Sequence, residues 1–232
     1  MLSTTQVTIV RDDNDVNVPI PANYIIANAS ATTVDYGVVI QDLSGNEWVW
    51  VPVDNPNEMS DTIASTQLGS SGVYTTLQSK GNIISGISRV SVGDTSGYRE
   101  PDLITSDNVS NASTAGFGSV AAMATALKDD YAAMIASVKQ YKGFYIGRYE
   151  LTGSVSSPTE KSGTVITNTN WYNLYAACKK FGNNNETIES RMIWGIQWDE
   201  VVKFINTKGD KITNLTDSSS YGNYSSSKAS FG

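Results

Sequence analysis

The chain has 232 residues, 40% of them hydrophobic, which is enough to bury one substantial core, so we expect one main domain. A net charge of −7 without a Lys/Arg cluster argues against binding to nucleic acid or to an anionic lipid surface. No apolar run approaches the roughly 20 residues that span a bilayer, so we expect no membrane insertion. Histidine is absent and Cys178 is the single cysteine, which excludes Ser–His and Cys–His nucleophile pairs and cysteine-cluster metal sites within these residues. We therefore expect no catalytic residue, metal or cofactor here.

The first 33 residues alternate short β-rich runs with turns, and they predict a hairpin-rich N-terminal segment (1–33). The sequence DDND at residues 12–15 is the turn between the first two runs. The first six residues show no secretory signal. Strands are expected at residues 7–10, 16–20 and 24–27.

The strongest predicted hairpin joins residues 36–41 to residues 46–53 through a Ser-Gly-Asn turn. In its second strand Trp48, Trp50 and Pro52 share one face, and valines share the other. Both faces of this strand are therefore expected to be covered.

A polar insertion is expected at residues 54–115, with one short strand near residues 88–92. Apolar residues spaced by three and four then predict an amphipathic helix over residues 118–141, which Gly143 is placed to end.

The remaining elements are a strand at residues 144–151 and two helices. One helix is expected to begin at Trp171 with Asn170 as its N-cap, and Gly182 to close it. The second is expected over residues 197–206. Its predicted buried side chains are Trp198, Val201, Val202 and Ile205.

Four segments, in this order, resemble the formylglycine-generating-enzyme (sulfatase-modifying factor) family. EWVWVPV at residues 47–53 is similar to the opening strand of that family, and FYIGRYELT at 144–152 to its Phe-Tyr-Ile-x-Lys-Tyr-Glu-Val-Thr strand. TNW at 169–171 is similar to its Val-Ser-Trp step into a helix, and residues 190–200 to its Arg-Leu-Pro-Thr helix start. The resemblance implies an α+β fold of the C-type-lectin-like class, occupying residues 34–232 and truncated at the C-terminus.

The resemblance also bears on activity. The copper-binding cysteines of the family's oxidases lie in a region beyond Gly232, and Trp194-Gly195-Ile196 replaces the family's Pro-Thr. The chain therefore looks most like non-catalytic relatives, such as bacterial surface proteins, prophage proteins and the variable proteins of diversity-generating retroelements. A fragment that lacks the family's central strands is expected to be only marginally stable.

Several polar side chains are candidate sites. Cys178 is expected to pack in the core rather than to be a reactive thiol, since it shares a helical stripe with Trp171. Arg148 and Glu150 are expected to form structural ion pairs, with each other or with neighbouring loops.

The acidic residues of two other segments have structural interpretations as well. The 12–15 segment is expected to be a solvated turn rather than a calcium site, and Asp199-Glu200 to stabilise a helix N-terminus. Most tryptophans fall on predicted core faces, and Trp194, in a loop before a glycine, is the expected exception and the candidate ligand-binding residue.

The sequence thus favours a ligand- or receptor-binding module for an unidentified protein or carbohydrate, on a bacterial surface or a phage particle. A formylglycine-generating type of oxidase with cysteines downstream, and a structural fibre or virion component, are the alternatives.

Overall fold

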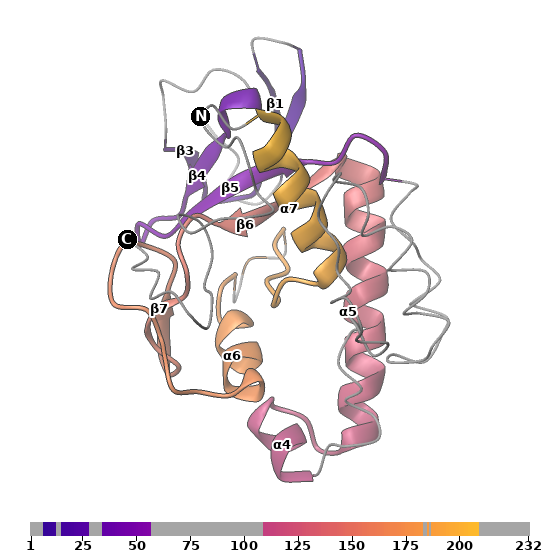
Figure 1. Cartoon of the computed structure of the whole chain (residues 1–232), viewed down its shortest axis with the longest axis vertical. Coiled ribbons are helices and arrows are strands. Elements are labelled where there is room, and N and C mark those ends of the chain that lie inside the picture. The colour runs from indigo at the N-terminus through magenta and orange to yellow at the C-terminus, as the bar shows by residue number, and fades with distance from the viewer. Residues whose placement is uncertain are drawn as a thin grey trace, which may run out of the picture.

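The computed structural model describes residues 7–12, 15–27, 34–56, 109–182, 185 and 187–208. Within them the chain is α+β, as expected, with small antiparallel sheets and separate helices (Figure 1). The strands are β1 (Thr8–Arg11), β2 (Asn17–Ile20), β3 (Ile25–Ile26), β4 (Val39–Gln41), β5 (Glu47–Pro52), β6 (Gly143–Gly147), β7 (Thr152–Ser154) and β8 (Ser157–Thr159). The helices are η1 (Val34–Tyr36), α4 (Val109–Thr114), α5 (Val120–Tyr141), α6 (Trp171–Cys178) and α7 (Gly195–Lys208).

The central sheet has the order β3-β4-β5-β6 and is antiparallel throughout. The predicted hairpin is confirmed as β4 and β5, which pair from Val39 opposite Val49 to Gln41 opposite Glu47. Asp42 stabilises its turn, because the carboxylate accepts backbone N–H bonds from Ser44 and Asn46 at 2.8 and 2.9 Å.

β5 has a hydrophobic cluster on each face, as its alternating sequence predicts. The face that carries Trp48 and Trp50, here the tryptophan face, packs with Val18 and Ile20 of β2. On the opposite face, here the valine face, Val51 packs with side chains of α5 and α7. The shared strand therefore joins two cores.

The N-terminal segment contains the three predicted strands. β1 and β2 form a hairpin from Thr8 opposite Ile20 to Arg11 opposite Asn17, while β3 pairs with β4 at the edge of the central sheet. Tyr145 of β6 donates its hydroxyl to the Pro19 carbonyl at 3.0 Å, which ties the hairpin to the sheet. The division between residues 1–33 and 34–232 stays a prediction.

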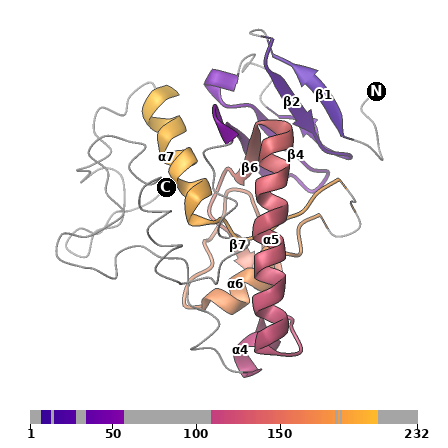
Figure 2. The ribbon, with the colours of Figure 1, turned by 90° about the vertical axis from the view of Figure 1, so that its right-hand side faces the viewer.

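α5 confirms the helix expected over residues 118–141. Ser119 is its N-cap, and the side chain accepts the Ala122 N–H at 3.1 Å. The helix runs from α4 at one end of the molecule to the central sheet at the other (Figure 2). Its buried stripe consists of Met123, Leu127, Tyr131, Ile135 and Val138.

The expectation that Gly143 ends this helix is wrong. The left-handed residue that closes α5 is Lys142, with φ of 63°, and Gly143 is the first residue of β6. A Cβ at Gly143 would lie 2.4 Å from Cζ2 of Trp50 and 2.6 Å from the Val51 carbonyl oxygen. Glycine is required there by the indole of Trp50, not by the end of the helix.

Two elements were not expected from the sequence. α4 lies at the end of the predicted 54–115 insertion, and its Ala112 is fully buried. The β7–β8 hairpin lies in a segment that reads as a loop. The strand expected near residues 88–92 lies outside the described residues.

α6 has Asn170 as its N-cap, as expected, and the side chain accepts the Asn173 N–H at 3.0 Å. It ends at Cys178, and Gly182, with φ of 75°, follows in the next turn. α7 begins at Gly195, two residues earlier than predicted, and ends at Lys208. None of the described helices has the length and apolar character to cross a membrane.

Gly143→Ala is expected to destabilise the fold by about 1–3 kcal/mol, because the new methyl group overlaps the Trp50 ring and the Val51 carbonyl. The matched control is Gly118→Ala, since a Cβ at Gly118 meets no atom within 4 Å. Urea unfolding of both variants measures the difference. Equal stabilities would show that Trp50 does not depend on the glycine.

Candidate functional site

Trp194, the predicted ligand-binding residue, is partly buried and packs against the core on the valine face of β5. Its ring meets that of Tyr131 edge to face, with centroids 5.0 Å apart. Its backbone N–H donates to Oε1 of Gln197 at 3.0 Å, so the residue lies in the first turn leading into α7. The expectation that Trp194 lies outside the core is therefore wrong.

The exposed tryptophan is Trp198 instead, with 53% of its surface accessible. Its predicted burial is wrong because the phase of the helix differs from the predicted one. Two residues on from buried Ile196, the Trp198 side chain points about 200° around the helix axis. Among the described side chains of α7, those that face the core are Ile196, Glu200, Val201, Phe204 and Ile205. Val202, also predicted to be buried, has a side chain outside the described ones.

The earlier start of α7 also changes the role of the acidic pair. Asp199 and Glu200 fall in the second turn of α7, so the first turn contains no acidic residue and the expected role is wrong for Glu200. The side chain of Asp199 lies outside those that the structure describes. Glu200 is buried.

The other tryptophans lie in the cores, as predicted. Trp50 is buried, Trp48 packs at the edge of the same cluster, and Trp171 stacks on Tyr175 with centroids 5.0 Å apart. These rings are occupied by protein contacts, which leaves Trp198 as the exposed indole.

Cys178 is half-buried on α6. Burial, and secondarily the negative charge of Glu160, raise the pKa of its thiol to about 11. A thiol with so high a pKa is poorly nucleophilic at neutral pH, in line with the expected packing role.

Arg148 forms a structural ion pair, but its partner is Glu47 of β5 rather than Glu150 or a neighbouring loop. The guanidinium Nη1 lies 2.7 Å from Glu47 Oε2, directly across the β5–β6 pair. The Arg148 backbone N–H also donates to the Glu47 carbonyl at 3.0 Å. Glu150 is exposed.

Of the acidic 12–15 segment the structure describes Asp12 and Asp15, and the Asp15 N–H donates to the Asp12 carbonyl at 3.0 Å. Residues 13 and 14 lie outside the described residues, so the expected solvated turn stays a prediction. The two carboxylate oxygens of Asp12 accept backbone N–H bonds from Val16 and Val34, both at 2.7 Å. Asp15 pairs with Arg11 at 2.9 Å. In the part of the chain that the structure describes, no three acidic, Cys or His side chains gather to hold a metal.

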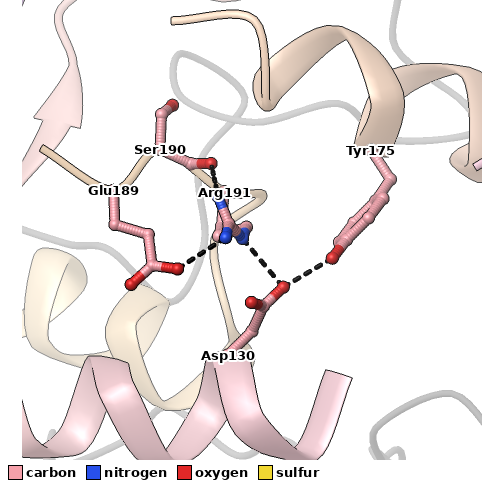
Figure 3. A network of polar contacts seen from close by, with 5 residues as sticks. All are labelled: Asp130, Tyr175, Glu189, Ser190 and Arg191. Carbon is pink, nitrogen blue, oxygen red and sulfur yellow. Dashed lines mark hydrogen bonds and ion pairs between the residues drawn. The ribbon is translucent and has the colours of Figure 1, made fainter. Parts of the chain in front are cut away.

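A polar network that was not predicted lies between α5, α6 and the segment before α7 (Figure 3). Asp130 of α5 accepts a hydrogen bond from the Tyr175 hydroxyl at 2.5 Å and lies 2.8 Å from Nε of Arg191. Arg191 also pairs with Glu189 and donates to the Ser190 carbonyl at 2.7 Å. These contacts hold the chain that leads to Trp194 and Trp198.

A second unforeseen group surrounds Glu160, just after β8. The main chain of Glu160 is fixed to the start of β5: its carbonyl accepts the Glu47 N–H, and its N–H donates to Oδ1 of Asn46, both at 2.8 Å. Its carboxylate fills the space over Gly147, where a Cβ would lie 2.3 Å from Oε2. Gly147 is opposite Trp48, so this carboxylate lies on the tryptophan face.

The surroundings of that carboxylate are largely apolar. Trp48 meets Tyr24 and Phe181 edge to face, with centroids 5.3 and 5.7 Å apart. Oε2 of Glu160 is closed off from solvent and has no hydrogen-bond partner among the described residues. Burial raises the pKa of the Glu160 carboxyl to about 7.

No family model, curated protein or solved structure matches the chain.

Arg191→Met is expected to destabilise the protein by about 1–3 kcal/mol, because it leaves the nearly buried Asp130 carboxylate without its cation. Arg11→Met is the control, since the Arg11–Asp15 pair is exposed on both sides and worth less than about 0.5 kcal/mol. Thermal unfolding compares the two. A loss no larger than that of the control would show that the network does not anchor the 189–194 segment.

Proposed function

We propose that this chain is a non-catalytic ligand-binding module with a C-type-lectin-like scaffold, from a bacterial surface or a phage particle. The family-like segments supply β5, β6, α6 and the start of α7, and they pack on the same central sheet and its two cores. That assembly of segments far apart in the sequence supports the scaffold assignment.

The observation that carries the binding role is the exposure of Trp198 on a firmly held helix. Ile193, also exposed at 41%, precedes the same helix. Trp194 against Tyr131, and Arg191 against Asp130, fix the backbone between them. A large aromatic side chain presented by rigid backbone loses little entropy when a ligand covers it, which is typical of the residues that dominate binding.

The ligand class that an exposed indole fits is a carbohydrate or a protein. An indole stacks on the C–H face of a sugar ring and equally fills a pocket on a protein. We assign Trp198 as the contact residue in place of Trp194.

Trp198→Ala is expected to reduce binding at least tenfold without changing the unfolding midpoint, because the side chain contributes to the surface and not to the core. The matched control is Leu43→Ala, which removes another exposed apolar side chain, at 88%, from the β4–β5 turn. Binding is measured on a printed glycan array and against a phage-displayed peptide library.

Hits that survive Trp198→Ala and Leu43→Ala equally would contradict the assignment of Trp198. Oxygen consumption by the copper-loaded chain with a sulfatase-derived cysteine peptide would contradict the non-catalytic role. Stable trimers or polymers on a sizing column would favour a fibre component instead.

A further inference from the structure

We propose that the protonation state of Glu160 controls how firmly the β7–β8 hairpin is attached to the central sheet. The neutral carboxyl holds the hairpin to β5 and β6, and ionisation of the carboxyl loosens it. This inference concerns a conformational device and does not depend on the binding role of Trp198.

The first support is geometric. Glu160 immediately follows β8, and its two backbone bonds to Asn46 and Glu47 attach the hairpin to the start of β5. Its carboxylate fills the space that the glycine at 147 leaves open, so the side chain is inserted into the junction. Movement of this one side chain therefore bears directly on the attachment of the hairpin.

The second support is that, within the described part of the chain, no neighbouring group stabilises a negative charge on Oε2 of Glu160. Oε2 is enclosed without a hydrogen-bond partner among the described residues, and the Trp48–Phe181 contact covers the same face of the sheet. Ionisation places negative charge on an oxygen, Oε2, that is shut off from water and gains no partner among the described residues. The neutral carboxyl of Glu160 is therefore the form that this enclosed position favours.

The charged groups on the surrounding elements are engaged elsewhere. Across the sheet, Glu47 and Arg148 pair with each other on the valine face. Lys161 lies 3.4 Å from the Ser44 carbonyl, and Lys180 donates to carbonyls of the β7–β8 turn. On α6, the Cys178 thiol is the titratable group whose pKa Glu160 raises further. Asp42, in the β4–β5 turn, accepts from Ser44 and Asn46.

The direction of the pH effect follows from these surroundings. Burial raises the pKa of Glu160 from its ordinary 4.5 to about 7, so the folded state retains a proton that the unfolded state releases between those values. This contribution to stability is complete below about pH 4.5 and is lost as the pH rises through about 7. Loosening of the hairpin is thus expected on the alkaline side of neutrality.

The test compares unfolding midpoints of the wild type, Glu160→Gln and Glu150→Gln from pH 5 to pH 8.5. The amide of Glu160→Gln is a neutral isostere, so the midpoint of the wild type should fall relative to it by on the order of 5 °C over this range. Glu150→Gln, which removes an exposed carboxylate of the same type, should follow the wild type. Identical pH profiles for the wild type and Glu160→Gln would overturn the proposal.

Two measurements on the wild type keep the proposal testable if Glu160→Gln does not fold. Carbon-13 NMR of the glutamate carboxyls should show one titration midpoint near 7, and midpoints near 4.5 for every glutamate would refute the buried neutral acid. Amides of β7 and β8, corrected for intrinsic rates, should exchange faster at pH 8 than at pH 6 relative to those of α5. A constant ratio would refute the loosening.

Discussion

Strand β5 is the part of the structure on which the rest depends. It pairs with β4 on one side and with β6 on the other, and its alternating side chains enter two different cores. The Trp50 indole lies directly over Gly143 of β6 and is buried in the core beneath the N-terminal hairpin, so this contact joins the β5–β6 pair to that core. Neither core can form fully without this strand in place.

The polar contacts of Asp130 position segments that lie outside the central sheet. Asp130 links α5 to Tyr175 of α6 and to Arg191, and Arg191 lies just before α7. The result is a helix whose inner side packs into the core and whose outer side presents Trp198. The proposed recognition surface and the Glu160 junction thus lie on elements organised around the same sheet.

The sequence predicted those elements whose signal is local. The two-residue alternation of β5, the three- and four-residue spacing of α5 and the N-cap of α6 each lie within one segment, and all three are confirmed. α4 was missed because VSNAST carries no apolar stripe, and its helix depends on Ala112 entering a core built by distant residues.

The site residues were predicted less well than the elements, because their surroundings come from distant parts of the sequence. The predicted roles of Trp194 and Trp198 are exchanged because the core face of α7 is centred on Ile196, Val201 and Phe204 rather than on Trp198. Glu160 and Asp130 gave no signal, since the groups that surround them come from β5, β6, α6 and the 189–194 segment. Their chemistry exists only after the fold has formed.

The central claim, that β5 and β6 hold both cores together, is tested most directly by native-state amide hydrogen exchange. We expect the amides of β5 and β6 that are bonded within the sheet to exchange only through global unfolding, with the highest protection in the chain and with the same free energy as the buried stripe of α5. Exchange of β5 and β6 through local opening, at a clearly lower free energy than α5, would contradict the account.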